Sequence, residues 1–253
     1  MFHWFIQKQL SNEEGYDDII RTMNVFNIPH TIISSLQNID NCFCIEKPIM
    51  ILGSYSLIRL GQLNKWKSGS FMNDNHTYLK WIENYGNAML NYDAIIKPLN
   101  DIVIHNPSFL RPVEDTKSFS GTIFQTNNDF VLWKNQKILQ NKDILNLNTN
   151  VVLSPLKTIY KEMRFFIVDK TIISASIYKQ NGQNFISNII DEDARNFTKS
   201  QIQKWQPARA FVIDIAQTDN GFKIVEINCI NCSGFYACDA QSIVMAIEQM
   251  ELF

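Results

Sequence analysis

Three side chains near the end of the sequence combine types and spacing that suit a hard cation. Asp214 ends one short apolar run, and Glu226 and Asn228 stand two residues apart in the next run. The connecting segment Thr218–Gly221 predicts a hairpin, because Asn-Gly tolerates the positive φ of a tight turn. Positions two apart on a strand share a face. Carboxylate and amide oxygens, with phosphate and water, are ligands for Mg²⁺, so the pattern predicts a magnesium site, with solvated strand residues as the alternative.

An arginine lies inside a second apolar run. Arg164 is flanked by Met163 and Phe165 and shares a strand face with Glu162. A buried charge without a partner is prohibitively costly, so Arg164 must either pair with Glu162 or another nearby acid, or grip a phosphate or carboxylate in bidentate fashion. Lys179, at the end of the following strand, raises the same question, and a solvated strand end is its alternative.

A polar loop with small residues precedes this region. Arg111 ends an apolar strand, and Lys117 and Ser118 lie in the segment Glu114–Gly121. Such a loop can fold over phosphates and offer backbone N–H groups and one ammonium. It lacks the glycine and Lys-Ser/Thr spacing of a Walker A motif, and an ordinary surface loop is the alternative.

The cysteines are expected to be reduced thiols. The chain has five, including Cys42-x-Cys44 and Cys229-x-x-Cys232. A zinc or redox site is the alternative, but the second pair follows a strand and neither pair has a clear second half of a zinc site. Buried or half-buried thiols are the favoured interpretation.

Composition indicates a folded protein of one large or two small domains. Of the 253 residues, 45% are hydrophobic and 12% aromatic, and the formal net charge is −2. This balance argues against a nucleic-acid or membrane-surface partner. No apolar run reaches the length of a membrane span, and the first ten residues lack a secretory signal pattern, so a cytoplasmic location is expected.

Strands and helices alternate in residues 1–94. This predicts a small α/β unit with a mostly parallel sheet. The clearest strand is the continuous apolar run Pro48–Ser54, which is typical of a strand buried on both faces. The expected strands are Phe2–Ile6, Thr31–Ser34 and Pro48–Ser54, and the expected helices are Glu13–Phe26, Tyr55–Trp66 and His76–Leu90.

Residues 95–253 predict grouped strands with few helices, which is an α+β pattern. The best helix is Asp191–Trp205, with acids in its first turn, and Asp169-Lys170 marks the turn of a long hairpin. The other expected elements are strands Ile95–Pro98, Ser108–Pro112, Gly121–Phe124, Val151–Leu156, Met163–Val168 and Ile172–Tyr178, and the helix Asp239–Leu252.

The order of these features resembles the ATP-grasp superfamily. Phe109–Pro112 with Lys117–Gly121, a Val-Leu-Ser-Pro hinge, Glu162-x-Arg164 and the final Asp…Glu-x-Asn hairpin follow one another as in that superfamily. With the motif from Asn228 to Asp239, they are similar to a divergent clade of small bacterial and phage proteins, in which arginine replaces the first ATP-binding lysine. The resemblance covers about residues 95–253.

The resemblance implies an ATP-grasp fold in which two α+β subdomains clasp ATP. Residues 95–152 would form the first subdomain and residues 153–253 the second, which carries the metal-binding strands. Residues 1–94 would form the small α/β domain that precedes the nucleotide fold in this superfamily.

The resemblance also implies a role for each site residue. Arg164 and Lys179 would be catalytic, at the γ-phosphate or the substrate carboxylate. Asp214, Glu226 and Asn228 would bind Mg²⁺. Asn231 and Ser233 would bind substrate or orient Asn228. The implied ATP-binding residues are Arg111, Lys117, Ser118, Ser154, Leu156, Lys157, Arg164 and Lys179.

The function that the resemblance implies is an ATP- and Mg²⁺-dependent carboxylate–amine ligase that acts through an acylphosphate. Its partners would be small-molecule or peptide carboxylates and amines. A phosphotransferase on the same scaffold and a non-catalytic nucleotide-binding interaction protein are the alternatives. The identity of the acid and amine is open, and so is a homodimer.

Overall fold

The computed structural model describes residues 1–36, 48–66, 69–113, 119–140 and 145–250. These residues form two compact units. The first unit combines residues 1–75 with residues 159–253, and the second unit comprises residues 76–158. Lys117 and Ser118, and the Cys42 and Cys44 pair, lie outside the described residues.

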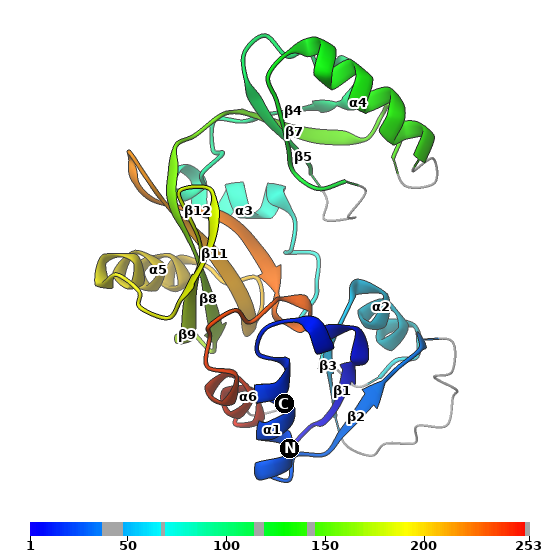
Figure 1. Cartoon of the computed structure of the whole chain (residues 1–253), viewed down its shortest axis with the longest axis vertical. Coiled ribbons are helices and arrows are strands. Elements are labelled where there is room, and N and C mark those ends of the chain that lie inside the picture. Colours follow the sequence, from blue (N-terminus) through cyan, green and yellow to red (C-terminus); the bar gives the residue numbers. More distant parts are fainter. Residues whose placement is uncertain (37–47, 67–68, 114–118, 141–144, 251–253) are drawn as a thin grey trace. The chain divides into compact units, whose positions relative to one another are not determined.

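A three-stranded parallel sheet opens the first unit, as predicted (Figure 1). Its central strand is β1, and β3 is buried along its whole length, which explains the continuous apolar run. Gly69 passes so close to β3 that a Cβ there would collide with the Ile49 carbonyl. The elements are β1 (His3–Gln7), α1 (Tyr16–Val25), β2 (His30–Ile33), β3 (Ile49–Leu52) and α2 (Tyr55–Leu63).

A five-stranded antiparallel sheet of order β10-β9-β8-β11-β12 completes the first unit. Both predicted hairpins are present: Asp169 and Lys170 have φ of 43° and 66°, and Gly221 has φ of 80°. The elements are β8 (Ile159–Val168), β9 (Thr171–Gln180), β10 (Gln183–Ser187), α5 (Glu192–Lys204), β11 (Ala210–Thr218), β12 (Gly221–Cys229) and α6 (Ala240–Glu248).

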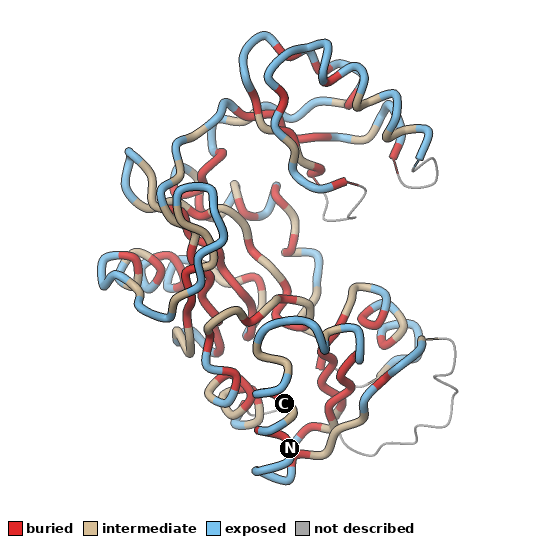
Figure 2. Tube along the Cα trace, in the orientation of Figure 1, coloured by how far each residue is buried: buried red, intermediate tan, exposed pale blue. Residues whose placement is uncertain are grey.

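One hydrophobic core joins the two sheets of the first unit. Trp4 of β1 belongs to the same buried cluster as Phe166 of β8, Val212 of β11 and Val244 of α6. At the edge of this cluster Glu248 accepts hydrogen bonds from the Trp4 indole Nε1 at 2.6 Å and from the Phe2 backbone at 3.1 Å. The buried positions run through both sheets (Figure 2). Residues 1–75 and residues 159–253 therefore stabilise one another.

The second unit has its own sheet and core. Its four strands are antiparallel, in the order β4-β7-β5-β6. Leu110 of β5, Val151 of β7 and Phe130 of α4 are buried together. The elements are α3 (Tyr78–Tyr85), β4 (Ile95–Pro98), β5 (Ser108–Pro112), β6 (Thr122–Phe124), α4 (Asn127–Gln140) and β7 (Asn150–Pro155).

The predicted α+β class is confirmed, and two elements are additions to the prediction. The sequence patterns did not predict α4 or the short strand β10. The predicted domain boundaries after residues 94 and 152 stay a prediction. Across the described residues, the helices are all too short or too polar to cross a membrane.

Candidate active site

A row of four polar side chains crosses the five-stranded sheet. Ser176 of β9, Arg164 of β8, Asp214 of β11 and Glu226 of β12 are directly opposite one another in the strand register. Residues on either side of them along β8 and β11, such as Phe165, are completely buried. Strand alternation therefore places the apolar side chains on one face and this polar row on the other.

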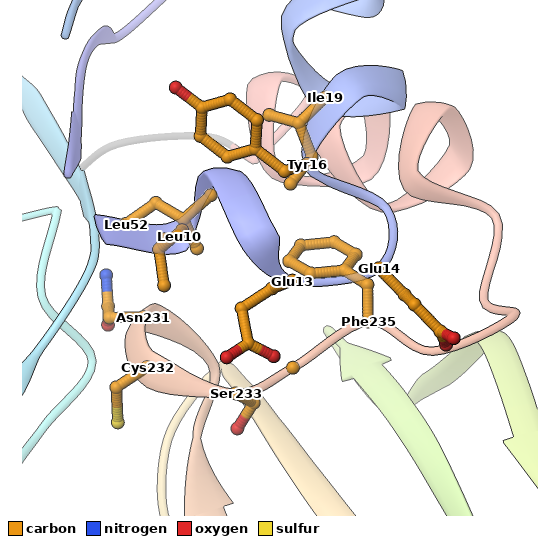
Figure 3. A pocket seen from close by; sticks show the side chains of 11 residues that line it. Leu10, Glu13, Glu14, Tyr16, Ile19, Leu52, Asn231, Cys232, Ser233 and Phe235 are labelled. Carbon is orange, nitrogen blue, oxygen red and sulfur yellow. The ribbon is translucent and has the colours of Figure 1, made fainter. Parts of the chain in front are cut away.

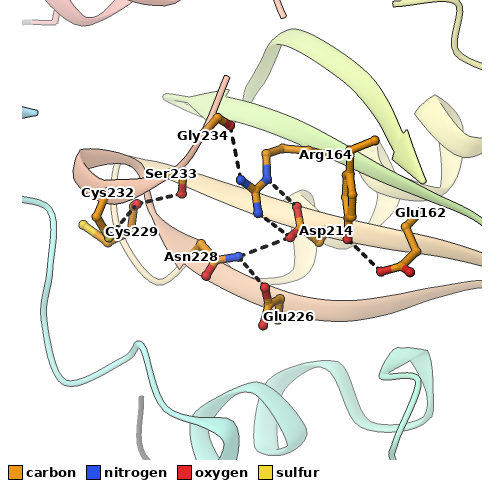
Figure 4. Close-up of polar contacts among 10 residues, drawn as sticks. Glu162, Arg164, Asp214, Glu226, Asn228, Cys229, Cys232, Ser233 and Gly234 are labelled. Atoms are coloured by element: carbon orange, nitrogen blue, oxygen red, sulfur yellow. Dashed lines mark hydrogen bonds and ion pairs between the residues drawn. The ribbon is translucent and has the colours of Figure 1, made fainter. Parts of the chain in front are cut away.

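The centre of the row is a buried ion pair. Arg164 donates from Nε to Asp214 Oδ1 at 2.9 Å and from Nη2 to Oδ2 at 2.7 Å, and the two residues are 8% and 1% exposed (Figure 4). Its Nη1 donates to the Gly234 carbonyl at 3.2 Å. The required partner of Arg164 is thus an acid on the next strand, and Glu162 is bonded elsewhere. These bonds use three of the five guanidinium N–H groups.

Burial and pairing act in opposite directions on the two charges. Burial raises the pKa of Asp214 to about 6, although Arg164 counteracts the shift. Burial by itself lowers the pKa of Arg164, but the attraction of the Asp214 carboxylate outweighs it and the net shift is upward. Both groups are therefore ionised at neutral pH.

Two tyrosines line the guanidinium, and sequence reasoning missed both. The rings of Tyr178 and Tyr236 stack with centroids 5.1 Å apart, and the Arg164 Cζ lies 5.6 Å and 5.2 Å from them. The Tyr178 hydroxyl donates to Glu162 at 2.9 Å, and Lys179 Nζ lies 3.3 Å from the same carboxylate. Cation–π contact with a desolvated guanidinium stabilises its orientation.

Tyr236 has a backbone conformation that is unusual for a bulky residue. Its φ is 50°, in the left-handed region that side chains with a Cβ rarely adopt. It lies in the Asn228–Asp239 motif, which was the signal that could have drawn attention to it. Nothing in the sequence could show that its ring reaches Tyr178.

Glu226 and Asn228 present the oxygens best placed for a cation. Asn228 Nδ2 donates to Glu226 Oε1 at 3.0 Å and to Asp214 Oδ2 at 3.3 Å, so its Oδ1 is turned away from both carboxylates (Figure 4). Among the described residues, no three His, Cys, Asp or Glu side chains are grouped to hold a metal by themselves. One carboxylate and one amide oxygen fit Mg²⁺ that is also bound by phosphates and water. Both oxygens of Asp214 already accept from Arg164, so the geometry supports its predicted metal ligation less well.

Asn231 and Ser233 are used by the fold. Asn231 is fully buried, and its Nδ2 donates to the carbonyls of Ile51 and Gly69 at 2.6 Å each, while its Oδ1 accepts from Phe71 N at 2.8 Å. Ser233 Oγ donates to the Cys229 carbonyl at 2.9 Å. These contacts favour the second of the two predicted roles, orienting the segment after Asn228. Substrate binding by either side chain stays a prediction.

The second unit carries the other predicted ATP-binding residues that the structure describes. Arg111 lies over the ring of Trp81, with Cζ 5.3 Å from its centroid. Ser154 is 1% exposed and its buried Oγ has no hydrogen-bond partner. Leu156 is 39% exposed, and Lys157 forms an ion pair with Asp93. A buried hydroxyl without a partner is costly, so Ser154 is the group in this strand most suited to a ligand.

Comparison with known protein families identifies the fold that carries this row. The model of an ATP-grasp domain family, the third family of its clade, matches residues 62–247. The chain belongs to this ATP-grasp family. The family assignment predicted from sequence is therefore confirmed, whereas the replacement of a family lysine by arginine stays a prediction.

Solved structures show the same fold over nearly the whole chain. This ATP-grasp protein is similar to D-cycloserine synthetase DcsG, with a TM-score of 0.69 and 9% identity, covering 98% of this chain and 99% of that one. A RimK domain ATP-grasp protein from Sphaerobacter thermophilus DSM 20745 gives 0.64 and 7%, covering 98% and 100%. D-alanine–D-alanine ligase from Bacillus anthracis complexed with ATP gives 0.61 and 10%, covering 98% and 96%. No curated protein sequence matches the chain.

Proposed function

We propose that this ATP-grasp protein is an ATP- and Mg²⁺-dependent carboxylate–amine ligase. The observation that carries the proposal is the in-register row of Arg164, Asp214 and Glu226 with Asn228 beside it. It places an oriented guanidinium and two cation-binding oxygens on one face of the sheet. Such a row suits chemistry in which negative charge develops on phosphoryl oxygens.

The reaction would activate a carboxylate by phosphorylation. A carboxylate oxygen attacks the γ-phosphorus of ATP and ADP leaves, which produces an acylphosphate. An amine then attacks the acyl carbon, phosphate leaves, and a C–N bond forms. The two N–H groups of Arg164 that its three hydrogen bonds leave over would stabilise charge on the transferred phosphoryl group or on the substrate carboxylate.

The remaining site residues would complete the nucleotide site. Glu226 and Asn228 would hold Mg²⁺, which offsets charge on the phosphates, and Asp214 would chiefly hold Arg164. Lys179 is the second proposed catalytic cation. Arg111, Lys117 and Ser118 are proposed to contact the phosphates, and Ser154, Leu156 and Lys157 to line the adenine.

Two neighbours support ATP and Mg²⁺ as the cofactor pair. D-alanine–D-alanine ligase was solved with ATP, and the ATP-grasp ligase PsnB was solved with a precursor variant, Mg and ADP, at a TM-score of 0.55. Small-molecule or peptide carboxylates and amines remain the proposed substrates.

The first test is calorimetric titration of ATP, with Mg²⁺ or with a chelator, into wild type and Glu226→Gln. We expect Mg²⁺-dependent binding, weakened at least about tenfold by Glu226→Gln because a carboxylate ligand is lost. Glu192→Gln, which removes an exposed carboxylate on α5, is the matched control and should bind like wild type. A folded wild-type protein that binds no ATP at about millimolar concentration would refute the proposal.

A second measurement separates ligase from phosphotransferase. A ligase releases ADP only when a suitable acid and amine are both present, because the amine must consume the acylphosphate. A stable phosphorylated product with no requirement for an amine would identify a phosphotransferase instead.

A further inference from the structure

Gly234 lies between two opposite charges. A Cβ built on it would be 3.8 Å from Arg164 Nη1 and 3.8 Å from Glu13 Oε2, with no other atom within 4 Å outside its chain neighbours. The guanidinium and the Glu13 carboxylate are therefore separated by no more than about twice 3.8 Å. In the described part of the chain these two groups form no ion pair with each other.

A cavity opens on the Glu13 side of Gly234. Its volume is about 130 Å³, and its apolar wall includes Leu10, Leu52 and Phe235. Figure 3 shows the Glu13 carboxylate turned toward the Ser233–Gly234 segment. The neighbouring Glu14 points its carboxylate away from that segment. An apolar cavity with one cation and one anion at its edge suits a ligand that carries both charges next to an apolar group.

We propose that this cavity binds an α-amino acid with a small apolar side chain, the acid substrate of the ligase. Its carboxylate would pair with Arg164, its ammonium with Glu13, and its side chain would enter the cavity. The proposal rests on the proposed ligase function, because Arg164 then faces the carboxylate that is phosphorylated. An α-amino acid suits the spacing because its ammonium and carboxylate are joined through a single carbon.

Gly234 contributes open space to this site. Its φ is outside the left-handed region, so backbone conformation does not require a glycine here. An added methyl at 3.8 Å from its neighbours would be in ordinary contact and would collide with nothing. Gly234→Ala should therefore fold normally and fill the position that the ligand needs.

The test measures ADP release with Mg²⁺, ATP and hydroxylamine as the amine, for each acid in turn. The acids are glycine, both enantiomers of alanine, and valine, each paired with the acid that lacks the ammonium: acetate, propionate and isovalerate. We expect at least one amino acid to support ADP release and its partner acid to be about tenfold or more poorer, because Glu13 loses a charge-assisted hydrogen bond.

The variants assign the effect to the cavity. Glu13→Gln and Gly234→Ala should each lower kcat/KM for the amino acid about tenfold or more while the calorimetric affinity for ATP stays unchanged. Glu14→Gln, the matched control, should behave as wild type. Calorimetry of the same amino acids without ATP should give binding that Glu13→Gln weakens by a similar factor.

The failures of the two proposals are distinguishable. If acids without an ammonium react equally well, or if Glu13→Gln and Glu14→Gln behave alike, the amino-acid proposal is wrong and the ligase proposal stands. Loss of ATP binding in the wild type would refute the ligase, and with it this proposal. If the protein binds ATP but none of these amino acids binds or supports ADP release, the cavity does not take this class of ligand.

Discussion

The arginine at the centre of the site shows how strongly one buried charge depends on its partner. Arg164 is 8% exposed and Asp214 is 1% exposed. Removal of one member leaves the other charged and unpaired in a medium of low dielectric constant, which costs more than the pair contributes when intact. Changing either residue therefore affects stability as well as chemistry.

Asp214→Asn is expected to lower the free energy of unfolding by about 3–5 kcal/mol, because Arg164 loses its counter-charge. Denaturant unfolding measures this value. Asp169→Asn is the matched control: Arg209 binds Asp169 in the same two-bond manner, at 2.7 Å and 2.6 Å, but both side chains are about half exposed. The control should cost less than about 1 kcal/mol. Equal losses in the two variants would mean that burial of the Arg164 pair does not matter.

Cys238 predicts a loss of stability at alkaline pH. Burial raises the pKa of this thiol from 9.0 to about 12. The unfolded chain therefore ionises first, so the contribution of Cys238 is present below pH 9 and decreases as pH rises toward 12. The expected slope is about 1.4 kcal/mol per pH unit within that window.

The measurement is denaturant unfolding of wild type and Cys238→Ala at pH 8.5 and pH 10. Wild type should lose about 1 kcal/mol more than the variant over this interval, since all other groups are shared. Parallel losses in both proteins would show that Cys238 ionises equally easily in the folded and unfolded states.

At the level of elements, α6 is held to the first strand by a carboxylate near its end. Glu248 accepts from the Trp4 indole at 2.6 Å and from the Phe2 backbone at 3.1 Å. Such an acid is unfavourable at a helix C-terminus, so these donors must compensate for the helix dipole. The contact joins residues near the beginning and the end of the chain.

Glu248→Ala should lower the free energy of unfolding by about 1–3 kcal/mol, because the indole N–H of the buried Trp4 is left without its acceptor. Glu192→Ala on α5 removes an exposed carboxylate, 69% accessible, from a surface ion pair and should cost less than about 1 kcal/mol. Thermal and denaturant unfolding compare the two. A Glu248→Ala variant as stable as Glu192→Ala would contradict the assigned role.

For the whole molecule, the first unit is one folding body made from both ends of the chain. Trp4 and Ile6 of β1 are buried in one cluster with Phe166 and Val212 of the five-stranded sheet. A chain that begins at residue 95 would expose these sheet residues to water, at a cost of roughly 25 cal/mol per Å² of apolar surface. The second unit has a separate core around Leu110.

The fragment 95–253 should therefore fail to fold cooperatively, although it spans the predicted nucleotide-binding domain. Circular dichroism and the binding of a hydrophobic dye report on this, and the full chain is the reference. We expect dye binding and a broad thermal transition for the fragment. A sharp transition with native-like stability would show that residues 1–75 are dispensable for folding.

Local patterns predicted most of the fold. The turns at Asp169-Lys170 and at Gly221 were identified because their residue types tolerate positive φ, and α5 was identified from its acidic first turn. Helix α4 was not predicted, because it buries only Phe130 and its other apolar residues do not form one stripe. A short exposed strand such as β10 carries too little pattern to be recognised.

By itself the sequence determined which residue types were available: an acid, a glutamate and an asparagine on paired strands, and an arginine that needed a partner. Only the tertiary structure decided that the partner is Asp214, because strand register is set by packing across the sheet. It likewise assigned Asn231 to structural bonds and brought Glu13 to the open side of Gly234. These contacts join segments far apart in the chain, and no local preference encodes them.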